Sequence, residues 1–378
     1  MKKFVSLLLI AMLMVGSLSG CGSKAADSDK LQIVTTIYPE YDWVMEILGD
    51  KASDAEVTLL LDDGVDLHSY QPTAEDILKI STCDVFIYVG GESDEWVEDA
   101  LQEATNKDMI VINLMESLGD SAKEEEVVEG MEGHDHDEDA EEHDHDEDAT
   151  EDEAEHEHDE DAEEEHDHDE DAEEHEHEEG EEHEHEEGEE HEHEHEEGEV
   201  EYDEHVWLSL KNAAALTQVI SDAIQKADSA NADAYKSNTE AYIAKLNELD
   251  EAYAEAVSEA STNTVLFGDR FPFRYMVDDY NLDYYAAFVG CSSETEASFE
   301  TITFLAGKVD ELSLNAVLTI ETSDQSIAKT IVENTESKDQ KILTLDSMQS
   351  TTADDIKDGV TYLSIMESNL EVLKEALN

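Results

Sequence analysis

The chain has 378 residues and a formal net charge of −83, with 103 Asp and Glu against 20 Lys and Arg. So large an excess of negative charge argues against a partner that is itself anionic, such as nucleic acid or an acidic lipid surface. The length suits two domains rather than one. Of the three cysteines, Cys83 and Cys291 lie far apart in the chain, and we expect two free, partly buried thiols rather than a disulfide.

The N-terminal segment has the features of a secretory signal. Two lysines give a positive start, and the apolar run 4–15 is too short for a typical membrane-spanning helix. The segment ends in Leu-Ser-Gly-Cys, which resembles the bacterial lipobox, where cleavage leaves the cysteine, here Cys21, as a lipid-carrying N-terminus. We therefore predict a signal peptide at 1–20, a tether at 21–30, and an extracytoplasmic protein that acyl chains anchor to the outer face of the bacterial cell membrane.

The next part of the chain, up to residue 113, alternates between apolar runs and segments with helical spacing. The runs are continuously apolar, which is typical of parallel strands that are buried on both faces. The predicted strands cover 31–37, 55–61, 84–89 and 109–113. The predicted helices between them cover 41–48, 77–81 and 96–104.

A second alternation follows a long helical segment. Residues 232–260 contain no Pro or Gly, and their pattern predicts one helix of about 40 Å at about 1.5 Å per residue. The sequence thus predicts an α/β fold, with two lobes of parallel sheet at 31–231 and 262–378 joined by one long helix at 232–261. In the second lobe, strands are predicted at 264–267, 283–288, 316–320 and 341–345, and helices at 272–280, 295–311, 326–334 and 358–377.

An acidic, histidine-rich tract at 134–199 interrupts the first lobe. It contains 42 Asp and Glu, no Lys or Arg, and 15 of the 17 histidines of the chain. Since no apolar burial offsets charge repulsion and chain entropy, we expect a disordered insertion over 120–202. Its histidines mostly stand two residues apart, so that neighbours point the same way in an extended chain and can chelate one ion. They are His134, His136, His143, His145, His156, His158, His166, His168, His175, His177, His183, His185, His191, His193 and His195.

Three roles remain open for this tract. Imidazole and carboxylate are ligands for divalent transition metals. The tract can gather metal and pass it to another site, buffer metal without passing it on, or act as a solvated acidic spacer. His68 and His205 are the two histidines outside it.

Four motifs follow one another along the chain. They read VTTIYPEYDWVMEILGD, DDGVDLHSYQPTAEDI, DVFIYVGG and DEHVWLSL. With the lipobox before them and the unbroken helix after them, they resemble the metal-binding lipoproteins of zinc and manganese ABC importers over nearly all of the mature chain. That family usually has prolines where Glu204 and Leu210 stand here, while the ligand His205 is kept. The resemblance implies two Rossmann-like lobes, a rigid linking helix and one metal site in the cleft between the lobes.

The resemblance also implies two metal ligands from each lobe. Loops at the carboxyl ends of parallel strands converge on such a cleft, so this arrangement is physically sensible. His68 and His205 are the predicted ligands of the first lobe. For the third ligand, zinc members normally have a histidine and manganese members often a glutamate, whereas the aligned carboxylate here is Asp269. Arg270 beside it is an alternative partner for that carboxylate.

The fourth predicted ligand is Glu321, directly after an apolar strand. Helix capping is its alternative role, and Asp324 is a nearby substitute. Two imidazoles and two carboxylates suit a four-coordinate zinc ion, whereas manganese prefers more oxygens. The ligand set alone leaves Zn²⁺ and Mn²⁺ open; the histidine-rich tract favours zinc, and one of its histidines is an alternative third ligand.

We therefore predict the extracytoplasmic zinc-binding component of an ABC metal importer, a monomer whose partners are a membrane permease and its ATPase. A manganese or iron version of the same protein, and a zinc-buffering surface lipoprotein or adhesin, remain alternatives. An enzyme such as a zinc hydrolase is disfavoured. A catalytic zinc ion keeps one of its positions open for water, whereas the four protein ligands predicted here occupy all four positions.

Overall fold

The computed structural model of the chain describes residues 30–132, 201–292 and 296–378. The chain divides into two units, Met1–His134 with Val200–Asn378 and, separately, Asp135–Glu199, and the fold lies in the first of these. The predicted signal peptide, Cys21 and the histidines of the tract lie outside the described residues. Among the residues described, no helix is both long enough and apolar enough to cross a membrane.

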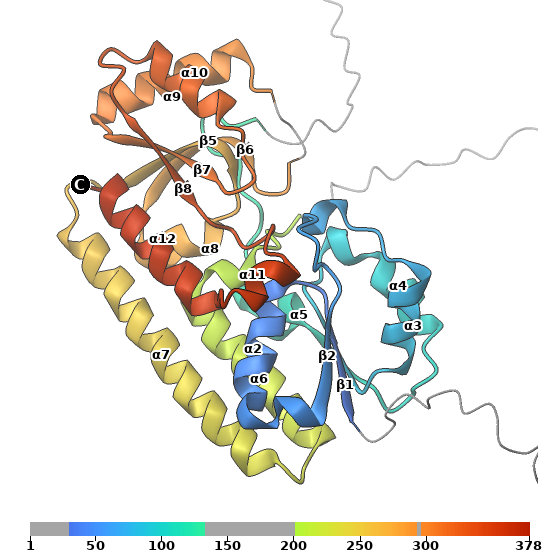
Figure 1. The fold of residues 1–378 in the computed structure, drawn as a ribbon. Coiled ribbons are helices and arrows are strands. Elements are labelled where there is room, and N and C mark those ends of the chain that lie inside the picture. Colours follow the sequence, from blue (N-terminus) through green and yellow to red (C-terminus); the bar gives the residue numbers. More distant parts are fainter. Residues whose placement is uncertain (1–29, 133–200, 293–295) are drawn as a thin grey trace, which may run out of the picture. The chain divides into compact units, whose positions relative to one another are not determined.

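The first lobe is built on a parallel sheet in the order β2-β1-β3-β4 (Figure 1). Its strands are β1 (Leu31–Thr35), β2 (Ala55–Leu59), β3 (Val85–Tyr88) and β4 (Ile110–Asn113). Its helices are α2 (Tyr38–Leu48), α3 (Ala74–Thr82), α4 (Trp96–Gln102), α5 (Leu114–Leu118) and α6 (Leu210–Ala227). The start of α3 is a capping box, in which Thr73 Oγ1 accepts from the Asp76 amide and the Asp76 carboxylate accepts from the Thr73 amide.

The second lobe repeats this plan with the strand order β6-β5-β7-β8, again all parallel. The strands are β5 (Thr264–Phe271), β6 (Asp283–Val289), β7 (Ala316–Ile320) and β8 (Lys341–Leu345). The helices are α8 (Arg274–Tyr280), α9 (Phe299–Leu312), α10 (Ser326–Asn334), α11 (Ala353–Lys357) and α12 (Tyr362–Ala376). The predicted fold class, two α/β lobes of parallel sheet, is therefore confirmed.

One long helix, α7 (Ala232–Glu259), connects the lobes. It packs on α2 and α6 of the first lobe and on α8 and α12 of the second (Figure 1). Its buried side chains recur at helical spacing, and one of them, Tyr253, donates a hydrogen bond of 2.6 Å to the Met366 carbonyl of α12. The helix is therefore held against both lobes along its length.

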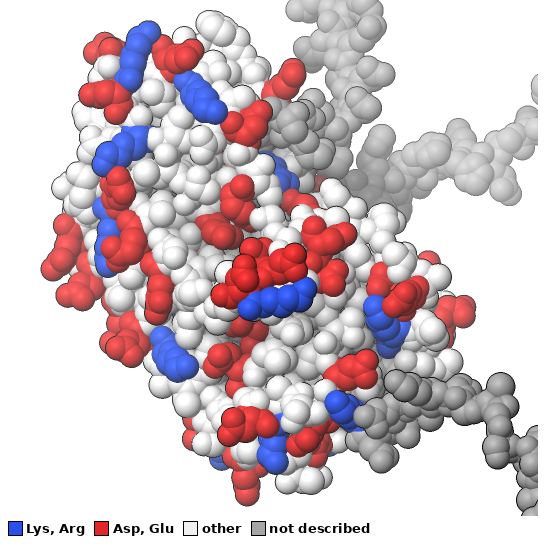
Figure 2. Space-filling model, viewed as in Figure 1, with Lys and Arg blue, Asp and Glu red and all other residues white. Residues whose placement is uncertain are grey.

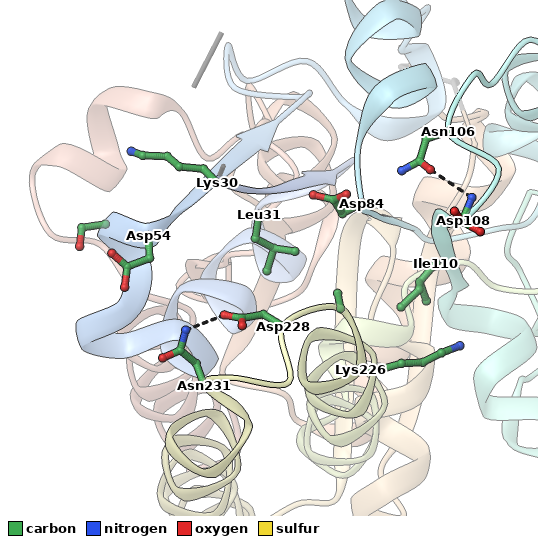
Figure 3. A pocket seen from close by; sticks show the side chains of 12 residues that line it. Lys30, Leu31, Asp54, Asp84, Asn106, Asp108, Ile110, Lys226, Asp228 and Asn231 are labelled. Atoms are coloured by element: carbon green, nitrogen blue, oxygen red, sulfur yellow. Dashed lines mark hydrogen bonds between the residues drawn. The ribbon is translucent and has the colours of Figure 1, made fainter. Parts of the chain in front are cut away.

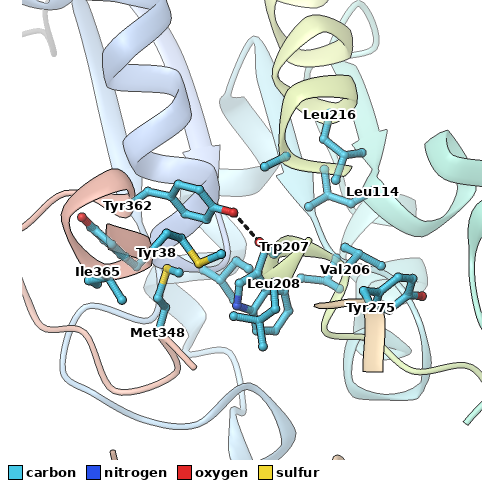
Figure 4. Close-up of a cluster of buried hydrophobic side chains, with 14 of the residues drawn as sticks. Tyr38, Leu114, Val206, Trp207, Leu208, Leu216, Tyr275, Met348, Tyr362 and Ile365 are labelled. Carbon is cyan, nitrogen blue, oxygen red and sulfur yellow. Dashed lines mark hydrogen bonds between the residues drawn. The ribbon is translucent and has the colours of Figure 1, made fainter. Parts of the chain in front are cut away.

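One hydrophobic core contains residues of both lobes, and a second, smaller one lies within the second lobe. The shared core contains Tyr38 of α2 and Tyr362 of α12, together with Trp207 and Met348 (Figure 4). Tyr362 Oη donates to the Trp207 carbonyl at 2.6 Å. Burial of side chains of this size contributes roughly 1.5–3 kcal/mol each, so opening the lobes widely would expose a large apolar surface.

Residues 122–132 and 201–203, which we call the stem of the insertion, contact the second lobe. The two sides of the stem pair with each other: the Glu125 amide donates to Glu201 and the Asp203 amide to Lys123, both at 2.9 Å. Glu132 then forms a parallel bridge to Phe288 of β6. Most of these residues fall inside the insertion that the sequence analysis placed at 120–202.

The end of β5 differs from the sequence-based expectation. The strand was predicted to end at residue 267 and instead continues to Phe271, with a shift of register between Phe267 and Arg270. A Cβ at Gly268 would lie 2.6 Å from Ala328 Cα, so only glycine allows α10 to approach the strand at the shift.

Candidate metal centre

His68 and His205 lie on two short turns near the strand ends. His68 belongs to the 3₁₀ turn η2 (Leu67–Ser69) that follows β2, and its amide donates to Asp66 Oδ1 at 3.0 Å. His205 precedes the turn η5 (Val206–Leu208), and its amide donates to Asp203 Oδ1 at 2.8 Å. A carboxylate two residues upstream thus fixes each histidine backbone.

These two histidines point their Nε2 atoms toward one another. Their Nε2 atoms are 3.2 Å apart, and the ring centroids are 5.1 Å apart. Two nitrogens bound to one tetrahedral zinc ion at about 2.0–2.1 Å lie roughly 3.3 Å apart. The observed separation is therefore that of two ligands on a single ion.

The other ring nitrogens are committed to polar partners. His68 Nδ1 lies 2.8 Å from Ser93 Oγ and 3.4 Å from Glu204 Oε2, and His205 Nδ1 lies 3.1 Å from Asp203 Oδ1. Because a carboxylate only accepts, Asp203 assigns the hydrogen of the His205 ring to Nδ1 and leaves a lone pair on its Nε2, whereas Ser93 Oγ can either donate to His68 Nδ1 or accept from it. The lone pair on His205 Nε2 points at His68 Nε2, so a metal ion or a proton can be held between the two rings.

The electrostatics around the two rings also favour a positive charge. Burial lowers the pKa of His205, but the charge and hydrogen bond of Asp203 outweigh it, and the pKa is raised above its ordinary value. Burial raises the pKa of Glu204, but its interactions with His68 and the Ser93 amide outweigh it, and the pKa is lowered. Both carboxylates are buried beside the histidines. A proton or a metal ion is the counter-charge that they require.

Cys291 is the third potential ligand at this place, and it is not among the ligands predicted from the sequence. One ligand atom each from His68, His205 and Cys291 lie within 4.8 Å of one another. Cys291 follows β6 by two residues, so the rule that ligands gather at the carboxyl ends of parallel strands would have found it. Burial raises the pKa of its thiol well above the ordinary value, and the charges of Asp203 and Glu204 add to this effect.

Asp269 lies outside this group of ligand atoms. Its Oδ1 accepts from the Arg270 amide at 2.9 Å and its Oδ2 from the Ile320 amide at 3.3 Å. Asp269 stands within the register shift of β5 against β6, and its carboxylate accepts from the backbone of β7. Arg270 does not pair with Asp269; its Nη2 lies 2.9 Å from Asp66 Oδ2.

Glu321 also lies outside the group. Its carboxylate accepts from the Ser347 amide at 2.8 Å, from Ser347 Oγ at 2.9 Å and from the Gln349 amide at 3.1 Å. Trp207 Nε1 donates to the carbonyl of the same Ser347 at 2.9 Å. Glu321 thus holds the loop that supports Trp207, two residues from His205. The substitute Asp324 is exposed and accepts from the Ser326 amide at the start of α10.

A cavity of about 510 Å³ is lined by residues of both lobes, among them sequence neighbours of His68 and Cys291 but not these two residues themselves. It is lined by Asp66 and Ser69 from the first lobe and by Asp269, Arg270 and Ser292, among others, from the second. It therefore gives the cluster an interlobe cleft.

A larger cavity of about 890 Å³ lies at the opposite edge of the first sheet (Figure 3). Lys30, Asp54, Asp84 and Ile110 place it at the amino ends of the four strands. His68 follows the carboxyl end of β2 and Cys291 follows the carboxyl end of β6, so we assign the metal centre to the interlobe cleft and not to this cavity.

Comparison with known proteins gives matches over the whole fold. Residues 33–376 match the family described as zinc-uptake complex component A, periplasmic. The chain is 29% identical over 374 residues to the zinc-binding lipoprotein AdcA of Streptococcus pneumoniae R6, covering 97% of this chain and 60% of that protein. It is 28% identical over 381 residues to the high-affinity zinc uptake system protein ZnuA of Bacillus subtilis, covering 100% and 98%.

Solved structures give the same fold. The Zn(II)-bound ZnuA-like domain of Streptococcus pneumoniae AdcA superposes with a TM-score of 0.60 at 26% identity, over 92% of this chain and 99% of that one. The metal-dependent lipoprotein YcdH of Bacillus subtilis gives a TM-score of 0.63 at 23% identity, over 92% and 99%. The chain spans about 60% of the length of the pneumococcal relatives it matches.

Proposed function

Because the chain belongs to the family of the periplasmic component A of the zinc-uptake complex, we propose that it captures zinc outside the cytoplasmic membrane and delivers it to an ABC importer. One observation carries the proposal. The Nε2 atoms of His68 and His205 face one another at 3.2 Å, while His205 Nδ1 lies 3.1 Å from Asp203 Oδ1 and His68 Nδ1 lies 2.8 Å from Ser93 Oγ and 3.4 Å from Glu204 Oε2. Such carboxylate–histidine pairs orient imidazoles toward a metal ion.

Zinc is the metal that this site suits best. Imidazole is a good ligand for zinc, whereas manganese prefers an oxygen-rich site of higher coordination number. The related proteins of known name are described as zinc-binding or zinc-uptake proteins. A manganese or iron importer component is thereby disfavoured, and competition binding between Zn²⁺ and Mn²⁺ tests that choice.

Asp269 and Glu321 remain predicted ligands. For either to reach the ion, it must give up hydrogen bonds, to the Ile320 amide in one case and to Ser347 and Gln349 in the other. Asp269→Ala and Glu321→Ala test them separately. An unchanged zinc affinity in either variant removes that residue from the site.

Delivery is proposed to take place at the membrane surface. Cys21 would carry the lipid anchor, and a permease with its ATPase would receive the ion. The core shared by the lobes resists a wide hinge, so metal binding would close the cleft only slightly. Acidic side chains spread over the face shown in Figure 2, with fewer basic ones among them, and would raise the local concentration of cations.

Titration calorimetry with Zn²⁺ in the presence of a competing chelator tests the proposal. The full chain is expected to show one tight site above the weaker background of the tract. His68→Ala and His205→Ala should each lose it. His143→Ala also removes an imidazole, but from the tract, and should keep the tight site. If His68→Ala or His205→Ala bound zinc as tightly as the parent chain, the proposal would be refuted.

A further inference from the structure

We infer that Cys291 is a zinc ligand, so that the cleft site is formed by two imidazoles and one thiolate. This inference rests on the proposed function and names a donor that the predicted set of histidines and carboxylates lacks. The cluster of His68, His205 and Cys291 is the group of potential ligands that the described residues bring together.

The geometry of the cluster fits a single ion. A nitrogen at about 2.0–2.1 Å and a sulfur at about 2.3 Å on one tetrahedral zinc ion lie roughly 3.6 Å apart. One ring nitrogen of each histidine and the Cys291 sulfur lie within 4.8 Å of one another, which exceeds that separation by roughly 1 Å at most. The histidine pair already has the separation of two zinc ligands. One position of a four-coordinate ion is left for an oxygen ligand.

The backbone around Cys291 holds it at the histidines. A Cβ at Gly290 would lie 3.0 Å from His205 Cε1 and 2.9 Å from the Phe271 carbonyl, so only glycine lets this strand end lie against the imidazole. On the other side, Arg270 Nη1 donates to the Ser292 carbonyl at 3.3 Å. Cys291 is thus fixed between two anchored neighbours.

The charges at the site favour the thiolate only when a cation is bound. Asp203 and Glu204 are buried beside Cys291 and repel an additional negative charge. Zn²⁺ supplies two positive charges. The sulfur would lose its proton to solvent as the zinc–sulfur bond forms, with no change of oxidation state. A thiolate also adds a soft ligand, which strengthens the preference for zinc over manganese.

Cys83 provides an internal control. It is buried at the end of α3, and its sulfur lies 3.2 Å from the Ile80 carbonyl and 3.3 Å from Met109 Sδ. It is absent from the metal-binding group among the described residues. Substituting Cys83 therefore removes a thiol without touching the cleft.

Co²⁺ binding tests the inference by absorption spectroscopy, because thiolate ligation gives a charge-transfer band in the near ultraviolet. The measurement uses the full chain with the substitution Cys21→Ala as the parent chain. Cys83 and Cys291 are then its only thiols. The parent chain and Cys83→Ser are expected to show the band at one equivalent of Co²⁺. Cys291→Ser should lose the band and bind zinc at least about tenfold more weakly.

Two outcomes overturn the inference: a parent chain without the band, or a band that persists in Cys291→Ser. If the parent chain has a tight zinc site that requires His68 and His205 but shows no band, the proposed function stands and the inference alone fails. If the parent chain has no tight zinc site, the proposed function itself fails.

A second measurement leaves the native side chain in place and so avoids any effect of substitution on folding. Alkylation by iodoacetamide is followed by mass spectrometry with and without Zn²⁺ in the parent chain. Zinc should protect Cys291 from modification. Equal modification rates of Cys291 with and without zinc contradict ligation.

Discussion

The guanidinium group of Arg270 joins the two sides of the metal cleft by pairing with Asp66. Nη2 lies 2.9 Å from Asp66 Oδ2, while Nη1 donates to the Ser292 carbonyl at 3.3 Å. Asp66 also accepts the amide of His68. One arginine of the second lobe therefore connects the loop of His68 to the loop of Cys291. The pair is only 17–18% exposed, so solvent screens it less than a surface ion pair.

Replacing Arg270 by alanine is expected to weaken zinc binding about tenfold and to lower the free energy of unfolding by about 1–3 kcal/mol, because Asp66 keeps a half-buried charge without its partner. Calorimetry and chemical denaturation measure the two effects. Arg274→Ala is the control: Arg274 also forms ion pairs, with Glu126 and Asp278, but does not bridge the ligand loops. Equal zinc affinities for Arg270→Ala and the parent chain would show that the bridge plays no part in the site.

A pair of glycine substitutions separates close packing at the site from general effects of glycine. Gly290→Ala should lower the free energy of unfolding by about 1–3 kcal/mol and weaken zinc binding, since the new methyl group would collide with the His205 ring and the Phe271 carbonyl. Gly307→Ala in α9 meets nothing within 4 Å and should stabilise the chain by about 0.5–1 kcal/mol with unchanged zinc affinity. Thermal unfolding and calorimetry check both. If Gly290→Ala proved neutral, the contact with His205 would not constrain the site.

Hydrophobic periodicity predicted the two lobes and the long helix, because it records these features directly. His68 and His205 were predicted as ligands from the resemblance of the motifs around them to those of a known family. Neither the periodicity nor the motifs could show that Asp269 and Glu321 are held by backbone amides. Asp269 stands within a register shift of β5 against β6, next to the close packing of Gly268 on Ala328, and neither feature has a pattern in the sequence. The position of Cys291 after a predicted strand could have marked it as a candidate ligand. Its type and its distance from Cys83 in the sequence predict only a free, partly buried thiol.

Glu204 stands where the family resemblance led us to expect proline, and the structure places its carboxylate 3.4 Å from His68 Nδ1. Glu204→Gln keeps the shape of the side chain and removes the charge that orients and polarises the imidazole. We expect a loss of zinc affinity of about 10- to 100-fold with little change in the fold. Calorimetry beside the exposed control Glu98→Gln measures it. An affinity equal to that of the control would mean that Ser93 Oγ alone orients the ring.

The raised pKa of the Glu40 carboxyl predicts that the stability of the fold depends on pH. This fully buried carboxyl accepts from the Thr36 and Ile37 amides, yet burial, followed by the charge of Asp94, raises its pKa from 4.5 to about 8. Between about pH 4.5 and 8 the folded chain therefore holds a proton that the unfolded chain has lost. The free energy of unfolding should fall as pH rises through this window, by at most about 1.4 kcal/mol per pH unit.

Denaturation with a chelator present, at pH 5, 6.5 and 8, measures this dependence in the parent chain and in Glu40→Gln. The variant has no carboxyl group to ionise, so its dependence should be shallower. The difference between the two curves isolates Glu40 from other titrating groups such as His205. Parallel curves would mean that Glu40 is already ionised throughout the window.

Removing the histidine-rich tract tests whether the tight site is independent of it. The ligand cluster lies in the unit formed by Met1–His134 and Val200–Asn378, and the two sides of the stem are already paired at Glu125 and Glu201. Replacing 134–199 by a short Gly–Ser linker should therefore preserve the fold and one tight zinc ion per chain, while the number of weaker ions falls. Since imidazole must be neutral to bind, the weak sites of the parent chain should also fade below about pH 6.5. Calorimetry on both chains at pH 7.5 and 5.5 distinguishes the two classes of site. Loss of the tight ion in the deletion would place a tract histidine among the ligands of the cleft.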